Sequence, residues 1–260
     1  MTMPPILRKL ADLAVKAGRE TLRVRESGMN LRHKADSSPV TAADEAAEEI
    51  ILAGLSELMP GVPVVAEEEA AAGRIPDIAD TFLLVDPLDG TKSFIAGRDD
   101  FTVNIARIEN GEPVVGVVFA PARGWLLAGA RGAGAFQSRD GGPPEPVKPP
   151  SEARERLRAV ASLNHRDAET DAWLAAHGIT DVVAAGSSLK LCLLATGEAD
   201  VYPRFGPTME WDIAAGHAVL AASGGRVLVA ETGEPLRYGK VETGFRNPAF
   251  IAWAAGIPSR

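Results

Sequence analysis

The chain has 260 residues, 46% of them hydrophobic and 24% charged, and its formal net charge is −8 at pH 7. This composition is typical of a soluble globular protein and excludes disordered, collagen-like and disulfide-scaffold proteins. The acidic balance has the wrong sign for a general binder of nucleic-acid polymers or anionic membranes, so any anionic ligand needs a local site.

The amino-terminal half, residues 1–140, begins with two predicted helices. Apolar residues recur every three or four positions from Ile6, and a second helix is expected from about Ala42 to Leu58, preceded by the capping-box spacing of Thr41 and Asp44. Buried strands are expected at 62–65 and 82–85, each running directly into acidic residues.

The rest of this half reads as antiparallel sheet. Segments 101–108 and 113–120 should pair around Asn110-Gly111, a strong hairpin signal, and 125–136 should form another hairpin. Glycine, proline and arginine residues interrupt the most apolar stretch, 113–136, so no integral membrane segment of roughly 20 residues is expected.

Residues 141–150 contain five prolines and two glycines and are interpreted as a linker. In the carboxy-terminal half, 151–260, strands and helices alternate, which predicts a layered α/β arrangement. The expected strands are 158–163, 181–185, 200–205 and 226–230, and the expected helices are 169–178, 187–197 and 211–224.

Charged residues interrupt the first twenty residues, where a signal peptide would need an unbroken apolar core. The single cysteine, Cys192, cannot form an internal disulfide. Both observations favour a cytoplasmic location, and peripheral association with the inner membrane stays open.

Three acidic clusters stand out along the chain. They are Glu67 to Glu69 after the first strand, the Asp86 to Thr91 segment after the second, and Asp212 at a helix start. Taken separately, each also fits a plainer interpretation: an acidic turn, a proline turn, and a first-turn acid favoured by the helix dipole.

Together these clusters supply oxygen ligands without His or Cys at metal-like spacing, which favours Mg²⁺ over zinc. The Gly90-Thr91 step beside the acids provides backbone amides that can hold an anion. Divalent ions acting on a phosphoryl group can activate water, so the combination indicates metal-assisted phosphoester hydrolysis.

The segments DPLDGT (86–91) and WDIAAG (211–216) together resemble the paired signature of the lithium-sensitive, magnesium-dependent inositol monophosphatase superfamily. Residues 34–44, 89–94 and 186–208, with the Asn164-His165 step, are similar to its CysQ-type branch, the 3'(2'),5'-bisphosphate nucleotidases. Departures from the usual pattern remove no ligand or charge that the mechanism needs; they are Ala66, Glu69, Ser93 and Ile213.

The resemblance implies an α/β fold, a five-layer α-β-α-β-α sandwich with the site between the two halves. It implies two or three Mg²⁺ ions, whose ligands would be Glu67, Asp86, the Leu88 carbonyl, Asp89 and Asp212, with Thr91 near the first ion. Asp44 and Thr91 would orient the attacking water, and Glu68 is a further candidate catalytic residue. The capping box and this catalytic role need different directions of the Asp44 side chain, and we favour the catalytic role because Thr91 otherwise lacks a relay.

The resemblance also implies a substrate site. Gly90, Thr91 and Lys92 would face the scissile phosphate, and the remaining candidates around the nucleotide are His165, Ser187, Lys190, Arg204 and Asp212. Plainer alternatives remain for several of these, such as a surface lysine, a helix cap or an edge-strand charge. Pro203 should place the strand before Arg204 at a sheet edge or where it enters a cleft.

The expected activity is a Mg²⁺-dependent phosphomonoesterase that removes the 3'-phosphate of adenosine 3',5'-bisphosphate, giving AMP and phosphate, with the sulfated precursor as a second expected substrate in sulfur assimilation. One alternative is the same chemistry on an inositol or sugar phosphate. Another is a catalytically silent metal-binding protein on the same fold. A monomer and a homodimer are both compatible with the sequence.

Overall fold

The computed structural model describes residues 2–28, 31–33, 39–148, 155–163 and 166–258. The helices are α1 (Pro5–Ser27), α2 (Ala42–Leu58), α3 (Glu67–Ala71), α4 (Thr91–Ile95), α5 (Ala168–Ala176), α6 (Leu189–Ala195) and α7 (Glu210–Ala222), with short 3-10 turns at Pro121–Arg123 and Val241–Thr243. The strands are β1 (Leu31–His33), β2 (Pro39–Thr41), β3 (Val64–Ala66), β4 (Thr81–Asp89), β5 (Thr102–Glu109), β6 (Glu112–Ala120), β7 (Trp125–Ala130), β8 (Gly134–Arg139), β9 (Glu145–Pro146), β10 (Arg158–Ser162), β11 (Asp181–Ala185), β12 (Val201–Arg204), β13 (Arg226–Val229) and β14 (Phe250–Trp253).

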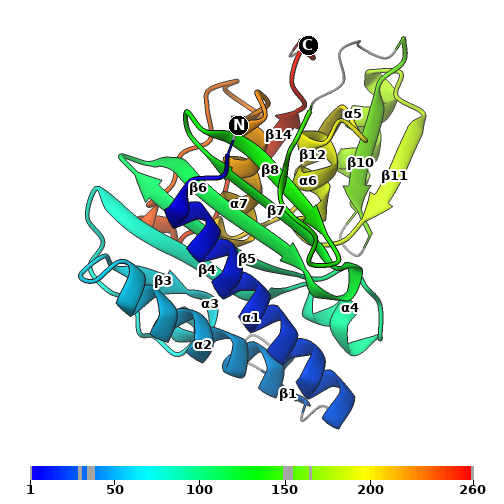
Figure 1. Ribbon diagram of the computed structural model, residues 1–260. Helices are drawn as coiled ribbons and strands as arrows, with labels where there is room; N and C mark the ends of the chain where they lie inside the picture. Colours follow the sequence, from blue (N-terminus) through cyan, green and yellow to red (C-terminus); the bar gives the residue numbers. More distant parts are fainter. Residues whose placement is uncertain (1, 29–30, 34–38, 149–154, 164–165, 259–260) are drawn as a thin grey trace.

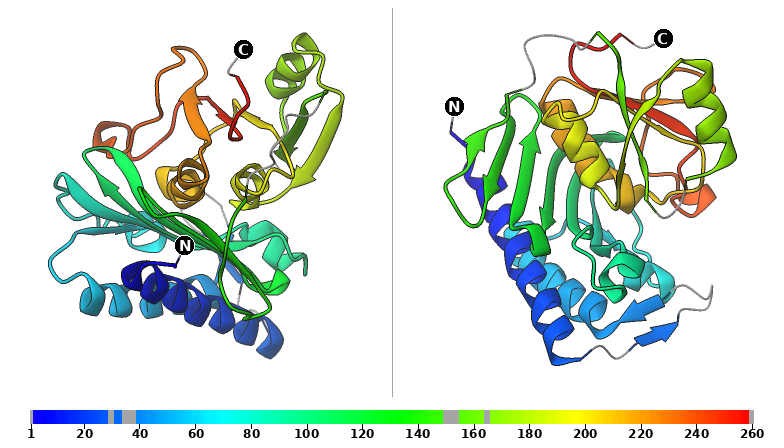
Figure 2. Two further views of the ribbon diagram at one scale, coloured as in Figure 1. Left: turned by 45° about the horizontal axis from the view of Figure 1, so that its top comes forward. Right: turned by 90° about the vertical axis from the view of Figure 1, so that its right-hand side faces the viewer.

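Five layers of helix and sheet alternate through the molecule. Helices α1 and α2 cover one face of a seven-stranded sheet, and α6 and α7 lie between its other face and a five-stranded sheet (Figures 1 and 2). Helix α5 packs on the outer side of the smaller sheet, where Trp173 meets Trp253 edge to face. The five-layer α-β-α-β-α arrangement expected from the family resemblance is therefore confirmed.

The large sheet has the order β3-β4-β5-β6-β7-β8-β9, and every pair except β3-β4 is antiparallel. Its two faces bury separate cores because side chains alternate along each strand. One core lies under α1 and α2, and the other holds α6, α7 and the inner face of the small sheet. Both expected hairpins form, β5-β6 and β7-β8.

Helix α7 lies very close to the large sheet because glycines face it. A Cβ at Gly116 would lie 2.2 Å from the carbonyl oxygen of Ala215, and one at Gly129 would lie 2.8 Å from the Cα of Val219. Any side chain at these strand positions would push the helix outward. The glycines therefore let the carboxy-terminal half pack directly on the amino-terminal sheet.

The small sheet has the order β11-β10-β12-β14-β13, which places β12 in its centre. The expectation of an edge strand around Pro203 is therefore wrong. Strand β10 pairs with β12 only through Ala159 and Val201, so that ladder has ended before Pro203. Proline is tolerated there because it has a strand neighbour on one side only, β14. The other expectation, a strand entering a cleft, is met at Arg204.

Several short elements were not expected from the sequence. Helices α3 and α4 each span one turn, and β14 completes the small sheet from the last residues of the chain. Strand β9 adds two residues of the expected linker to the edge of the large sheet. No helix among the described residues is long and apolar enough to cross a membrane.

Candidate active site

A bulge in β4 puts two acids on the same face of the large sheet. Asp86 and Asp89 are three residues apart, so in a regular strand their side chains would point to opposite faces. The ladder pairs Asp86 with Asn104 and Asp89 with Thr102, which are only two residues apart on β5. The extra residue in β4 brings the Asp89 side chain back to the same face of the sheet as the Asp86 side chain. Both carboxylates therefore point toward the layer of α6 and α7.

Leu88, inside the bulge, is anchored on the opposite side. Its side chain is buried in a small core with Phe94 and Phe101. Its N–H donates to Asp86 Oδ1 at 3.0 Å, and its carbonyl oxygen lies 3.3 Å from the Thr91 hydroxyl oxygen. The bulge is therefore held from both sides, and it extends the strand past the point where the sequence suggested a turn.

Two glycines from different halves pack on one residue of the chain between α4 and β5. Gly90 has φ +99°, and a Cβ there would lie 3.1 Å from the carbonyl oxygen of Asp100. A Cβ at Gly186 would lie 2.3 Å from Asp100 Oδ2 and 2.7 Å from that same carbonyl. The absence of side chains at both positions allows the loop after β4 and the loop before α6 to approach each other.

A cleft of about 530 Å³ opens at this meeting point. The predicted site residues that line it are Glu67, Asp89, Gly90, Thr91, Lys92, Ser187, Lys190, Arg204 and Asp212. Asp86 and Asp44 are buried just behind the cleft, 1% and 2% exposed. His165 lies outside the described residues.

Glu68 does not line this cleft. Successive helical side chains are about 100° apart, so Glu68 on α3 points away from Glu67. It lines a separate acidic depression together with Glu48. The expectation that Glu68 takes part in catalysis has no support from its position.

The acids of the cleft carry negative charge in a buried setting. Burial first, and then the charge of Glu67, raises the pKa of Asp86 well above its ordinary value. Burial and then the charge of Asp89 do the same to Asp212. Burial also raises the pKa of Asp89, although Lys190 and Ser187 act in the opposite direction. This accumulation of charge favours binding of a cation.

The donor set fits Mg²⁺ by its chemistry, since it consists of carboxylates and a carbonyl, all hard oxygen ligands. Among the described residues, no three acidic, His or Cys side chains are gathered closely enough to form a metal cage. One oxygen of each buried acid is held by a protein donor: Leu88 N for Asp86, the Ser187 hydroxyl for Asp89 and Met209 N for Asp212. Mg²⁺ usually takes only one or two carboxylates and keeps several waters, so such a cage is not required.

Asp44 combines the two roles that the sequence analysis treated as exclusive. Its Oδ2 accepts from the N–H and hydroxyl of Thr41 at 2.8 and 2.7 Å, which closes the capping box of α2. Its Oδ1 accepts from the Thr91 hydroxyl at 3.2 Å. The assumption that the roles need different side-chain directions was wrong, because each uses a different oxygen.

Lys190 and Arg204 are buried cations, each 7% exposed, on the carboxy-terminal side of the cleft. Burial lowers the pKa of Lys190 to about 8, while Asp89 acts in the opposite direction. Its ammonium donates to the carbonyl of Ser187 at 2.5 Å, and Arg204 donates to the carbonyl of Pro207 at 2.9 Å. Lys92, by contrast, is exposed at the mouth of the cleft.

Supporting residues that the sequence did not reveal hold these elements in place. Glu48 of α2, 4% exposed, accepts from the N–H groups of Glu68 and Glu69 at 2.9 Å each. It thereby fixes the start of α3, which carries Glu67. Burial, followed by the charges of Glu69 and Glu67, raises the pKa of Glu48 to about 7.

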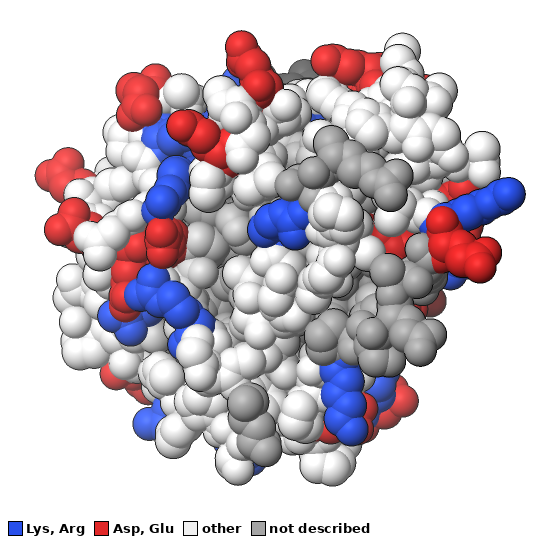
Figure 3. Space-filling model, turned by 90° about the horizontal axis from the view of Figure 1, so that it is seen from above, with Lys and Arg blue, Asp and Glu red and all other residues white. Residues whose placement is uncertain are grey.

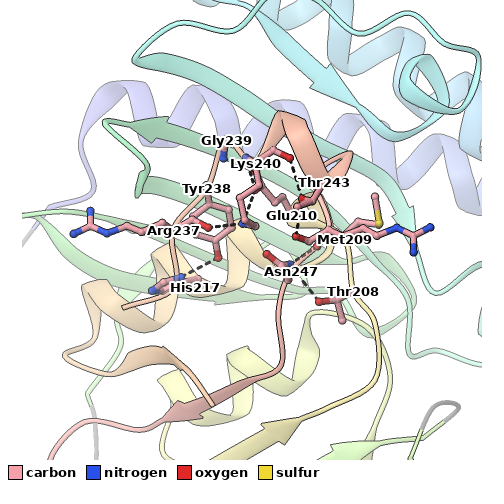
Figure 4. A network of polar contacts seen from close by, with 11 residues as sticks. Thr208, Met209, Glu210, His217, Arg237, Tyr238, Gly239, Lys240, Thr243 and Asn247 are labelled. Atoms are coloured by element: carbon pink, nitrogen blue, oxygen red, sulfur yellow. Dashed lines mark hydrogen bonds and ion pairs between the residues drawn. The ribbon is translucent and has the colours of Figure 1, made fainter. Parts of the chain in front are cut away.

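A second buried glutamate fixes the start of α7 (Figure 4). Glu210 accepts from the N–H groups of Gly239 and Lys240 at 2.8 and 3.0 Å, and forms a 2.5 Å ion pair with the Lys240 ammonium. Asn247 donates to the carbonyl of Met209 at 2.8 Å. This network holds the first turn of α7, in which Asp212 lies. Distant segments contribute to it, so no local sequence pattern could have indicated it.

On the face shown in Figure 3, acidic and basic side chains are interspersed around the periphery. Among the described residues visible in this view, Lys and Arg side chains do not join into one continuous basic surface.

The Inositol monophosphatase family profile matches residues 5–250. The 3'(2'),5'-bisphosphate nucleotidase CysQ of Escherichia coli K12 is 42% identical over 256 residues, covering 94% of this chain and 98% of that protein. The crystal structure of CysQ from Bacteroides thetaiotaomicron superposes with a TM-score of 0.81 at 40% identity, over 95% of this chain and 96% of that one. An inositol monophosphatase from Anabaena has a TM-score of 0.76 at 27% identity, over 96% and 91% of the two chains.

The chain therefore belongs to the inositol monophosphatase family. Bisphosphate nucleotidases are found among its relatives at about 40% identity along nearly the whole length.

Proposed function

We propose that the protein is a Mg²⁺-dependent phosphomonoesterase that converts adenosine 3',5'-bisphosphate to AMP and phosphate. The observation that carries the proposal is the composition of this cleft, where acids of the DPLDGT segment lie together with two buried cations. The acids can hold the metal ions that hydrolysis of a phosphate ester needs. The two cations can bind a second phosphate on the same substrate. The names of the relatives at about 40% identity support the same substrate.

Glu67, Asp86, the Leu88 carbonyl, Asp89 and Asp212 would hold the magnesium ions. When bound, the ions supply positive charge to the phosphoryl group and lower the pKa of the attacking water. The backbone amides at the start of α4 would hold oxygens of the scissile phosphate. Lys92, exposed at the cleft mouth, would add a mobile positive charge.

Thr91 and Asp44 would orient the attacking water. The Thr91 hydroxyl donates a hydrogen bond to Asp44 Oδ1, so its oxygen lone pairs are free to accept a hydrogen bond from the attacking water. Asp44 is fixed in turn by Thr41 through its other oxygen. The pair is thus preorganised for general-base chemistry.

Lys190 and Arg204 would hold the second phosphate of the nucleotide. Both are buried and line the cleft opposite Gly90 and Thr91. These two buried cations add positive charge on the side of the cleft away from the scissile phosphate, which a second phosphate group can use and an inositol monophosphate does not need. The sulfated precursor carries the same 3'-phosphate and is proposed as a second substrate.

Phosphate release from a substrate panel tests the proposal. Adenosine 3',5'-bisphosphate, inositol 1-phosphate and fructose 1,6-bisphosphate would be compared with Mg²⁺ and with EDTA. We expect the adenosine bisphosphate to give the highest kcat/KM, and EDTA to abolish it. A preference for inositol 1-phosphate would establish the alternative activity, and no release from any of them would contradict a phosphatase.

A further inference from the structure

The Ser187 hydroxyl joins the two halves at a predicted metal ligand. Ser187 lies between β11 and α6 and inserts its side chain beside Asp89 and Thr102, which are directly paired on β4 and β5. Its Oγ donates to Asp89 Oδ2 at 2.7 Å and lies 3.1 Å from the Asp89 carbonyl. Its other partner is the hydroxyl of Thr102, which is completely buried.

Counting protons fixes the direction of these bonds. A serine hydroxyl has one proton to donate, and an ionised carboxylate can only accept. The Ser187 proton therefore goes to Asp89, and Thr102 donates its own proton to Ser187. No proton remains on Ser187 for a phosphate oxygen of a substrate.

The backbone around Ser187 is also arranged about Asp89. Ser187 has φ +57°, an uncommon conformation for a residue with a side chain. The backbone N–H of the next residue, Ser188, acts to lower the pKa of Asp89. Gly186, just before, has no room for a Cβ against Asp100. The backbone conformation of Ser187 and the close approach at Gly186 thus bring the Ser187 hydroxyl onto the Asp89 carboxylate.

We propose that Ser187, supported by Thr102, is a positioning residue that orients the Asp89 carboxylate for magnesium, and does not bind the second phosphate of the substrate. The inference rests on the proposed function, since it assigns Asp89 to the metal. It replaces the substrate-binding role that the family resemblance implied for Ser187. The cations Lys190 and Arg204 keep that role.

Two variants remove the link from opposite sides. Ser187→Gly deletes the hydroxyl and suits the positive φ, so backbone strain does not confuse the result. Thr102→Val is nearly isosteric and removes only the supporting hydroxyl. Ser138→Ala is the matched control, because it deletes a buried hydroxyl that donates to the Gly142 carbonyl at 2.6 Å, far from the cleft.

Mg²⁺ affinity would be measured without substrate, by calorimetric titration and by the rise in Tm with Mg²⁺. We expect Ser187→Gly to weaken Mg²⁺ binding about 10-fold or more, the usual effect of losing a group that orients a metal ligand. Thr102→Val should weaken it in the same direction, the double variant should resemble Ser187→Gly, and Ser138→Ala should match the wild type. At saturating Mg²⁺, the ratio of kcat/KM for the adenosine bisphosphate over inositol 1-phosphate should stay within about twofold.

Unchanged Mg²⁺ affinity in Ser187→Gly would overturn the inference, whether or not selectivity changes. If that variant also lost tenfold in the substrate ratio, Ser187 would belong to the second phosphate site. Failure of the wild type to bind Mg²⁺ would instead contradict the proposed function, and the inference with it. The wild type binds Mg²⁺ if the proposed function is right, so a failure of the inference alone shows only in the Mg²⁺ affinity of Ser187→Gly.

Discussion

The hydroxyl of Thr91 and the carboxylate of Asp44 meet across 47 positions of sequence, at 3.2 Å, while the other oxygen of Asp44 caps the helix on which it lies. The capping contact fixes the carboxylate in the orientation that Thr91 requires. Asp212 repeats the device, since it occupies the same position of the first turn of α7 and accepts from Met209 N at 2.8 Å. Helix capping is thus a means of aiming acids into the cleft.

Because the two functions of Asp44 reside on different oxygens, they can be separated by mutation. Thr91→Ala should lower kcat far more than it raises KM, since the lost hydroxyl acts on the attacking water. Thr41→Ala should lower the free energy of unfolding by about 1 kcal/mol, and it should lower kcat much less than Thr91→Ala does, because the Thr41 N–H still holds Asp44 Oδ2. Asp44→Asn should show both effects.

Steady-state kinetics and denaturant unfolding of these variants check this prediction. A double variant of Thr91→Ala and Asp44→Asn should be no slower than the slower single variant, as expected of one relay. Independent, multiplying losses in kcat would contradict the relay. Loss of stability alone in Asp44→Asn would leave only the capping role.

Asp86→Asn should abolish activity and yet raise the stability of the metal-free protein. Asp86 is 1% exposed, and burial and neighbouring acids raise its pKa, so its charge destabilises the fold when no cation is present. We expect a loss of rate beyond about 10²-fold. In EDTA the variant should melt higher than the wild type, and Mg²⁺ should raise its Tm less.

Melting curves in EDTA and in Mg²⁺ provide the measurement. Asp77→Asn, at an exposed position of the same half, is the control and should behave as the wild type in both buffers. Full activity of Asp86→Asn at ordinary Mg²⁺ would show that Asp86 is not a ligand.

Selectivity for a doubly phosphorylated substrate should depend on Lys190 and Arg204. Replacing either by alanine should weaken binding of adenosine 3',5'-bisphosphate by about 1.5–3 kcal/mol, the contribution of a charge-assisted hydrogen bond. Hydrolysis of inositol 1-phosphate should change little. The measurement is the ratio of kcat/KM for the two substrates, with the exposed Arg23→Ala as control. An unchanged ratio in both variants would favour a sugar phosphatase.

Glu48 should make the metal-free protein more stable at mildly acidic pH. Its pKa is about 7 in the folded protein against 4.5 ordinarily, so the folded state binds the proton more tightly. The stabilising contribution is complete below pH 4.5 and is lost as the pH rises through about 7. It amounts to the order of 1–3 kcal/mol.

Burial also raises the pKa values of Asp86, Asp89 and Asp212, so these acids change stability with pH in the same sense as Glu48 does. A variant of Glu48 is therefore needed to measure its own contribution. The free energy of unfolding in EDTA would be measured at pH 6 and pH 8 for the wild type and for Glu48→Gln. We expect the difference between the two pH values to be smaller in Glu48→Gln. Equal differences would show that Glu48 does not titrate in this range.

The longer elements could be predicted because their signals are local. The capping residues and apolar spacing around α2 gave its bounds, 42–58, and alternation with Asn110-Gly111 gave the β5-β6 hairpin. The motifs around Asp86 and Asp212 indicated the acids of the cleft in the same way. Helices α3 and α4 were missed because each is a single turn, too short to show a period.

Other features depend on contacts that no sequence window contains. The bulge that turns Asp89 to the face of Asp86 is defined by its register with β5. The hydrogen bond between Ser187 and Asp89 joins residues 98 positions apart. The central place of β12 follows from β14, which arrives nearly 50 residues later. In each case the local sequence is compatible with more than one structure, and contacts with distant segments determine which one forms.

The glycine contacts of α7 have a consequence for folding. The helix lies so near Gly116 and Gly129 that its buried face is shared by both sheets, and separating the halves would expose that face to water. The halves should therefore unfold in one cooperative transition, with no intermediate in which one half stays native. Because the halves share this packed face, we expect the cleft along their boundary to keep its shape when substrate enters.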